Sequence, residues 1–342
     1  MDMTEQKNDF GVGSVEQNII RMAVPMTVAQ ILNLLYNLVD RMYIGHIPGA
    51  SSLALTGVGI TFPIISMITA FANLFGMGGA PLCSMARGRR DYDAAKRYMQ
   101  NAFWMLLAAG VVLTVTGYVI EKPLLYALGA SSVTYPYASS YLRIYLLGNM
   151  FVMVGIGMNP FINAQGFGTM GMVTVGLGAL VNIILDPLFI FVFHMGVEGA
   201  AIATIIAQFL SALWVLFFLT GEKPDLRLKI CWRKPEFTVV KEIVSLGLSN
   251  FFMLFTNSLV QVVCNRQLQL YGGDLYVGVM TVLISVRDVA TMVVNGITSG
   301  AQPVISFNYG AQKKDRVKQG IRFMVTICII YTCLMWIMTL TF

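Results

Sequence analysis

Residues 57–96 read GVGITFPIISMITAFANLFGMGGAPLCSMARGRRDYDAAK, and the chain carries a second version of this stretch. In both versions a long apolar segment leads through small residues and a proline into a basic loop. Five matches at one constant separation of 222 residues indicate an internal repeat. A second membrane half in the same orientation is a pattern from which transporters are built. The matched pairs are Gly78 and Gly300, Pro81 and Pro303, Gly88 and Gly310, Asp93 and Asp315, and Lys96 and Lys318.

The length of the repeat predicts the domain organisation. Two full units need about 444 residues, whereas the chain has 342. We therefore expect a complete first unit and a C-terminally truncated second one. The predicted parts are an N-lobe of six transmembrane helices (1–219), a cytoplasmic loop between the lobes (220–238) and three helices of a partial C-lobe (239–342).

The composition indicates an all-α polytopic membrane protein. Hydrophobic residues make up 56% of the chain and charged residues only 12%, whereas soluble domains carry about 25% charged residues. The mean hydropathy is +0.70. Apolar runs of this length predict membrane-spanning helices. The nine predicted spans are 19–44, 53–86, 99–119, 137–163, 170–194, 200–219, 240–270, 276–307 and 321–342.

The loops predict the orientation of these spans. Lysine and arginine gather in the loops after the second, sixth and eighth spans, at 87–97, 223–234 and 313–318. The positive-inside rule places these loops and the N-terminus in the cytoplasm, so we expect a multi-pass protein of a bacterial cytoplasmic membrane. Since the basic residues alternate between loops, the formal charge of +6 does not indicate binding to nucleic acid.

The motifs of common enzyme classes are missing from the sequence. There is no GxxxxGK[ST] loop and no HExxH motif, and the two histidines form no credible Ser-His-Asp arrangement. The five cysteines show no CxxC spacing, so we expect no metal or disulfide framework. We therefore expect that the protein is not an enzyme and has no cofactor. We expect an ion gradient to supply the energy for transport.

Acidic residues inside the spans predict a functional site, because an acid at the bilayer centre costs about 2.5–3.5 kcal/mol. Asn33, Asn37 and Asp40 are spaced to share one face of the first span, with Tyr36 beside them. On the fifth span, Asn182 and Asp186 are four residues apart. A carboxylate in a low-dielectric site can exchange a proton near neutral pH, and added Asn and Thr oxygens suit Na⁺. The other interpretation is that Asp40 only reaches the outer interface and Asp186 only hydrogen-bonds across helices.

Further polar residues predict a cavity lined by several spans. Asp288 heads a polar stripe on the eighth span, and its neighbour Arg287 is not expected to face it, because adjacent residues diverge on a helix. The candidate cavity residues are Asn33, Tyr36, Asn159, Asn163, Gln208, Asn257, Gln261, Asp288 and Asn295; the candidate cation-coupling residues are Asp40, Asp186, Asn182, Asn37 and Thr204.

The chain resembles the multidrug and toxic compound extrusion (MATE) family over nearly its whole length. The segments that carry the resemblance are AVPMTVAQILNLLYNLVDRMYIG (23–45), VNIILDPLFIF (181–191) and GAQPVISFNYGA (300–311). The resemblance implies two six-helix lobes and a monomer that exports amphipathic organic cations in exchange for H⁺ or Na⁺. It also implies that Asp40 and Asp186, with Asn182 and Thr204, form a cation site. An acid in the seventh helix, used by other branches of the family, is missing here, where the span carries Gln261.

Two alternatives stay open at this point. The first is a flippase for a lipid-linked precursor, built on a related two-lobe architecture. Such a cavity needs cations for a pyrophosphate, and Arg143 and Arg287 are the only intramembrane candidates. The second is a truncated chain that does not transport.

Overall fold

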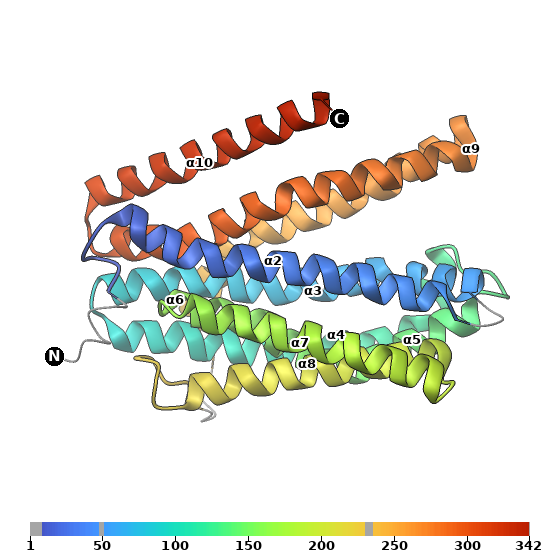
Figure 1. The fold of residues 1–342 in the computed structure, drawn as a ribbon. Coiled ribbons are helices and arrows are strands. Elements are labelled where there is room, and N and C mark those ends of the chain that lie inside the picture. Colours follow the sequence, from blue (N-terminus) through green and yellow to red (C-terminus); the bar gives the residue numbers. More distant parts are fainter. Residues whose placement is uncertain (1–8, 48–50, 230–234, 342) are drawn as a thin grey trace.

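The computed structural model describes residues 9–47, 51–229 and 235–341, except for some side chains at 51–52 and between 258 and 285. Within these residues all regular structure is helical, as predicted (Figure 1). The helices are α2 (Val15–Gly45), α3 (Ser51–Gly88), α4 (Tyr92–Ala127), α5 (Tyr135–Leu147), α6 (Asn149–Ala164), α7 (Gly168–Pro187), the π-helical η1 (Leu188–Val192), α8 (Gly196–Thr220), α9 (Phe237–Gly310) and α10 (Lys314–Thr341).

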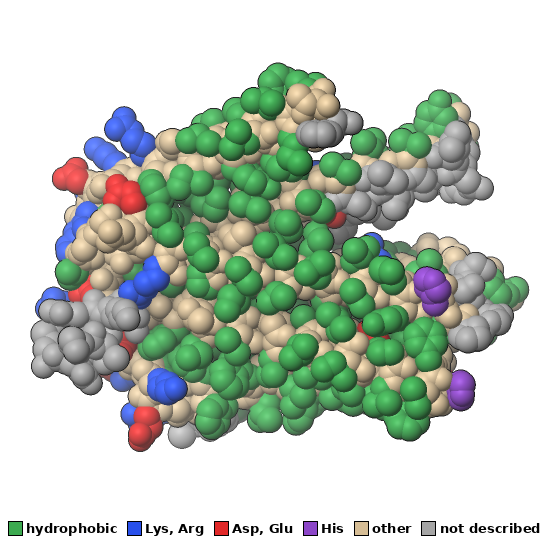
Figure 2. All heavy atoms as spheres, in the orientation of Figure 1, with side chains coloured by type: hydrophobic (Ala, Val, Ile, Leu, Met, Phe, Trp, Pro, Cys, Tyr) green, Lys and Arg blue, Asp and Glu red, His purple; other side chains and the backbone are tan. Residues whose placement is uncertain are grey.

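The helices are long and apolar enough to cross a membrane. Among the described residues, seven helices meet this condition, or eight when α5 and α6 count as one bent span. Figure 2 shows hydrophobic side chains over the middle of the molecule, while lysine and arginine gather at one end. We call this the basic end; it holds the turns 88–92 and 311–314 and the segment 221–229. The two histidines lie at the opposite end (Figure 2).

The fourth predicted span, 137–163, is not one straight helix. It breaks at Gly148 into α5 and α6, which are bent by 59°. Gly148 packs against Ile205 of α8, where an added Cβ would lie only 2.5 Å from the nearest side-chain atom. A residue without a side chain therefore allows α8 to approach the bend closely. Sequence periodicity does not reveal this break, because both halves are apolar.

Helix α9 reverses direction along its length and appears as two neighbouring ribbons in Figure 1. Near its start Gly247 lies against Leu74 of α3, and at its end Gly310 lies against Met85 of the same helix. Leu74 and Met85 are about 16 Å apart along α3, whereas a straight α9 would separate Gly247 from Gly310 by about 95 Å. The predicted spans 240–270 and 276–307 are therefore two arms of α9.

Two apolar clusters hold the helices together. The larger one fills the space among α3, α4, α5, α6 and α8. The smaller one joins the start of α2 to the second arm of α9, through residues such as Ile19, Met22, Ala301 and Val304. Helix α2 thus packs on both α9 and α7. The lobe boundaries at 219 and 239 stay a prediction.

Candidate functional site

Asp40 of α2 and Asp186 of α7 meet inside the bundle. The two residues are 7% and 0% exposed, and their carboxyl groups are close enough to interact electrostatically. Asp186 stands at the end of α7, directly before Pro187, and the chain continues as the wider turn of η1. Two carboxylates in contact and away from water require a shared proton or a bound cation.

Asn182 and Thr204 complete this cluster from two helices. The Asn182 Nδ2 donates to Asp186 Oδ1 at 3.2 Å and to Thr204 Oγ1 at 3.3 Å. Thr204 in turn donates to the carbonyl of Ala200 at 2.9 Å, one turn earlier in α8. Both side chains are buried. The four residues of the carboxylate cluster, Asp40, Asn182, Asp186 and Thr204, therefore come from α2, α7 and α8.

Three oxygens of the carboxylate cluster are buried without a hydrogen-bond donor. They are Asp40 Oδ1, Asn182 Oδ1 and Asp186 Oδ2. Buried polar atoms are normally satisfied, because an unpaired one costs about 1–3 kcal/mol. Oxygen donors from carboxylates, an amide and a hydroxyl form a donor set that fits Na⁺ or a proton. These three oxygens are therefore available as acceptors for a proton or as ligands for a cation.

Three tyrosines surround the carboxylate cluster. The sequence predicted Tyr36 as a site residue but not Tyr141 and Tyr145. The hydroxyls of Tyr36 and Tyr141 lie next to Thr204, and both interact with the charge of Asp40. Tyr145 interacts with Tyr36 and stacks on Tyr141, with ring centroids 6.3 Å apart. Tyr141 and Tyr145 are four residues apart on α5, so their shared helix face was a signal available in the sequence.

The polar stripe of α2 divides between two environments. Tyr36 and Asp40 turn towards α7 and α8, whereas Asn33 and Asn37 are exposed. The amide of Asn37 donates to the carbonyl of Asn33 at 2.7 Å and to its Oδ1 at 3.2 Å. A stripe of this width straddles the boundary between the buried and exposed faces of the helix. Asn37 is therefore not placed against the carboxylates with Asn182 and Thr204.

Asn159 and Asn163 lie away from the carboxylate cluster. Both face Gly171 of α7, and Asn159 Nδ2 donates to the Gly171 carbonyl at 3.3 Å. Gly171 is about 22 Å along α7 from Asp186, so these amides belong to the half nearer the basic end. Gln208 is half-buried and faces Gly155 of α6, one turn after Thr204.

The predicted cavity residues of α9 are exposed where the structure describes them, namely at Asn257, Asp288 and Asn295. The side chain of Gln261 lies outside the described residues. The expectation that Arg287 and Asp288 do not meet was wrong: they form an ion pair at 3.1 Å. Both side chains are more than half exposed, so the long guanidinium folds back to its neighbour. Among the described side chains, no group of three or more His, Cys, Asp or Glu could hold a metal ion.

These features define a class: a polytopic helical membrane protein with a buried carboxylate pair between helices. The MatE family model matches residues 25–188 and 250–342, and the chain belongs to this family.

Curated relatives cover most of the chain. Multidrug export protein MepA of Staphylococcus haemolyticus (strain JCSC1435) is 27% identical over 334 residues, 97% of this chain and 73% of the relative. MepA of Staphylococcus aureus (strain NCTC 8325 / PS 47) is 26% identical over 338 residues, 96% of this chain and 74% of the relative.

Solved structures agree in fold. An outward-facing multidrug resistance MATE family transporter of the MOP superfamily has a TM-score of 0.86 and 25% identity, over 93% of this chain and 70% of its own. A MATE crystal structure in the straight conformation has a TM-score of 0.88 and 23% identity, over 97% of this chain and 73% of its own.

Proposed function

We propose that the chain is a cation-coupled antiporter that exports amphipathic organic cations, drugs among them. The observation that carries the proposal is the contact between Asp40 and Asp186, with three buried oxygens left unpaired around them. Membership of the MatE family and relatives named multidrug export proteins support the same activity. H⁺ or Na⁺ is the proposed coupling ion, and no cofactor or enzymatic step is involved.

The carboxylate cluster acts on helix α2. A proton or Na⁺ between Asp40 and Asp186 removes their repulsion and draws α2 against α7. An empty, doubly charged pair pushes α2 away. Because α2 also packs on α9, with Gly296 against Thr27 and Gly300 against Ala23, a shift of α2 changes the α2–α9 contact. An ion with different affinity for the two arrangements then shifts their populations, which is the basis of alternating access.

The substrate path runs along the exposed polar residues of α2 and α9. Asn33, Asn37 and Asn295 offer hydrogen-bonding groups beside apolar side chains, and Asp288 adds a carboxylate that is paired with Arg287. This combination suits a lipophilic cation, which needs apolar contact and a partner for its charge. We place the basic end and the N-terminus in the cytoplasm of a bacterium by the positive-inside rule, and we propose a monomer in contact with membrane lipid.

The lipid-linked precursor flippase is less well supported. Its two candidate cations are both neutralised by carboxylates: Arg143 Nε lies 2.8 Å from Glu121 Oε2, and Arg287 pairs with Asp288. A pyrophosphate would have to displace a carboxylate at either arginine.

The test is gradient-driven uptake of a fluorescent lipophilic cation into inside-out vesicles, under H⁺ and Na⁺ gradients in parallel. Asp186→Asn is expected to abolish uptake, while Asp93→Asn, an exposed carboxylate at the start of α4, is expected to leave it unchanged. Equilibrium binding of the same cation, read by its fluorescence, is measured on each variant. Unchanged uptake in Asp186→Asn, or no binding by the parent chain, would overturn the proposal.

A further inference from the structure

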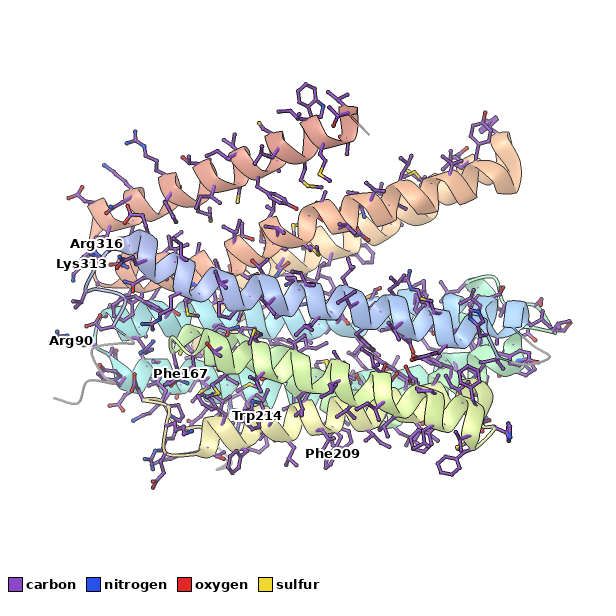
Figure 3. The ribbon with its side chains drawn as sticks, in the orientation of Figure 1. Arg90, Phe167, Phe209, Trp214, Lys313 and Arg316 are labelled. Carbon is purple, nitrogen blue, oxygen red and sulfur yellow. The ribbon has the colours of Figure 1, made fainter. Side chains whose placement is uncertain are left out.

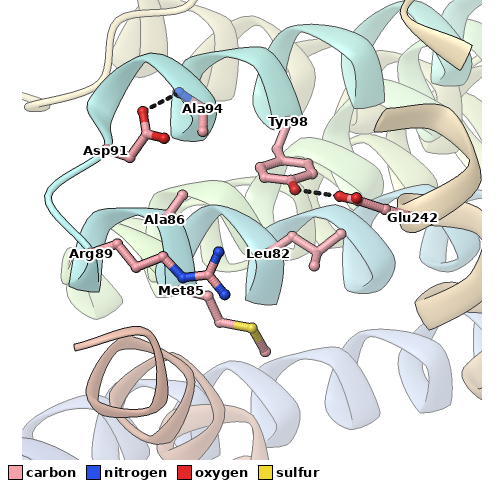
Figure 4. Close-up of a pocket in the computed structure, with 8 residues that line it drawn as sticks. All are labelled: Leu82, Met85, Ala86, Arg89, Asp91, Ala94, Tyr98 and Glu242. Carbon is pink, nitrogen blue, oxygen red and sulfur yellow. Dashed lines mark hydrogen bonds between the residues drawn. The ribbon is translucent and has the colours of Figure 1, made fainter. Parts of the chain in front are cut away.

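The basic end contains a pocket of about 240 Å³ between α3, α4 and the start of α9 (Figure 4). Leu82 and Met85 of α3 form an apolar wall, and Tyr98 of α4 faces them. At about 30 Å³ per water molecule, the pocket has room for about eight waters. This volume is below the range of about 300–1,000 Å³ that is typical of sites for drug-sized ligands, and it suits a lipid headgroup rather than a whole lipid.

The pocket presents both signs of charge. The guanidinium of Arg89 extends from the end of α3 into the space facing Tyr98, and Glu242 enters from α9 on the other side (Figure 4). Arg89 makes no ion pair with any carboxylate of the described residues. Glu242 accepts a hydrogen bond from the Tyr98 hydroxyl through Oε2, which leaves Oε1 available. Asp91 is already engaged, since it caps α4 by accepting from the Ala94 amide at 2.9 Å.

The walls of the pocket are held in place by contacts that do not involve a ligand. Arg97 lies 3.9 Å from Glu236, and the Glu236 amide donates to Asn101 Oδ1 at 3.0 Å. These two contacts fix the start of α9 against α4. The pocket also sits within two turns of the end of α3 and of the starts of α4 and α9. In the orientation proposed above, this end of the helices lies near the cytoplasmic membrane surface.

The geometry points to a binding site for the zwitterionic headgroup of a phospholipid with a primary ammonium. The phosphate binds Arg89, the ammonium binds Glu242, and the acyl chains leave along Leu82 and Met85. A purely anionic ligand would be repelled by Glu242 and Asp91, and an organic cation without an anionic group would leave Arg89 without a partner. The headgroup contacts both α3 and α9. The lipid therefore stabilises the arrangement of this structure, in which α3 and α9 are packed together at the basic end.

The test uses the purified chain in detergent, titrated with phosphatidylethanolamine, phosphatidylcholine or phosphatidylglycerol while thermal unfolding is recorded. Phosphatidylethanolamine is expected to raise the unfolding midpoint at lower concentration than the other two lipids. Arg89→Gln and Glu242→Gln are each expected to weaken this effect about tenfold, the loss that removal of one charge-assisted hydrogen bond predicts. Lys96→Gln, which removes a charge on α4 outside the pocket, is the matched control and keeps the preference.

Two results would overturn the assignment. The first is equal stabilisation by phosphatidylethanolamine and phosphatidylcholine, whose ammonium is methylated and cannot donate to Glu242. The second is a phosphatidylethanolamine preference that survives in both pocket variants. Competition by soluble phosphoethanolamine tests whether the site takes a lipid or a free headgroup. If phosphoethanolamine binds as tightly as phosphatidylethanolamine, the site belongs to a free metabolite and the lipid assignment is rejected.

Discussion

Gly88 and Gly310 meet at the basic end in a reciprocal contact. A Cβ added to Gly88 would overlap the carbonyl oxygen of Phe307, and one added to Gly310 would overlap that of Met85. Gly88 and Gly310 are 222 residues apart, and so are Met85 and Phe307. The repeat found in the sequence is thus present as a local two-fold relation between the end of α3 and the end of α9.

The first prediction concerns this contact. Gly88→Ala and Gly310→Ala are each expected to destabilise the protein by about 1–3 kcal/mol, because backbone atoms of the opposite helix must move to admit a methyl group. Gly59→Ala is the control within α3, since nothing lies within 4 Å of its added Cβ. Thermal unfolding in detergent measures the difference. Equal midpoints for Gly88→Ala and Gly59→Ala would contradict the close approach.

The second prediction concerns the tyrosines beside the carboxylate cluster. Tyr141→Phe removes a hydroxyl next to Thr204 and is expected to weaken coupling-ion binding about fivefold, the effect of one net hydrogen bond. Tyr137→Phe, on the same helix at a position whose Cβ packs on Gly57 of α3, is expected to have no effect. Ion titration of the unfolding midpoint measures both. If the ion dependence of the midpoint is the same in both variants, the Tyr141 hydroxyl does not contribute to ion binding and the residue only fills space in the bundle.

The third prediction is a pH dependence with a defined sign. Raising the pH removes the proton that Asp40 and Asp186 share, and two contacting carboxylates then repel each other. The unfolding midpoint in a potassium buffer is therefore expected to fall from mildly acidic to mildly alkaline pH. Asp186→Asn removes the repulsion and should flatten this part of the profile.

Sodium distinguishes the two coupling ions in the same experiment. If the site takes Na⁺, sodium raises the midpoint, and it does so more at alkaline pH, because protons and Na⁺ compete for the same oxygens. A proton site gives the same profile in sodium and potassium. A wild-type profile as flat as that of Asp186→Asn would contradict the shared proton.

The fourth prediction concerns the N-terminal segment 10–13, which the end of α9 and the start of α10 hold in place. Arg316 donates to the carbonyls of Phe10 at 3.0 Å and Gly13 at 2.9 Å, and Asn308 Nδ2 donates to Phe10 at 3.1 Å. Figure 3 shows Arg316 and Lys313 beside the start of α2, and Lys313 Nζ donates to the Gly11 carbonyl at 2.8 Å.

Arg316→Gln is expected to speed amide hydrogen exchange in residues 10–14 by about tenfold or more, since hydrogen bonds from a charged group are lost. Arg322→Gln, an exposed position on the same helix, is the control and should leave the exchange unchanged. Protection that persists in Arg316→Gln would mean that the remaining contacts hold the segment without Arg316, namely the hydrogen bonds from Asn308 and Lys313 and the Phe10–Phe307 ring contact, with centroids 5.9 Å apart.

The sequence predicted the helices well because apolar length and loop charge determine them. The family resemblance implied that Asp40 and Asp186 belong to one site, whereas their spacing in the sequence left other arrangements open; their role in coupling stays a prediction. The bend at Gly148 was missed because both halves of the span are apolar and the hydrophobic pattern does not change at the break. The contact of Arg287 with Asp288 was missed because helix spacing describes Cβ directions and not the reach of a long side chain.

The reciprocal contact of Gly88 and Gly310 has the form of an isologous interface, in which one surface patch meets a copy of itself. A single unit of the repeat carries both partners of this contact, a glycine and the carbonyl three residues before it. Two separate copies of such a unit, inserted in the membrane in the same direction, would therefore pair through this patch as a symmetric dimer. The chain thus carries within one polypeptide the self-association geometry of a protein that consists of a single repeat unit.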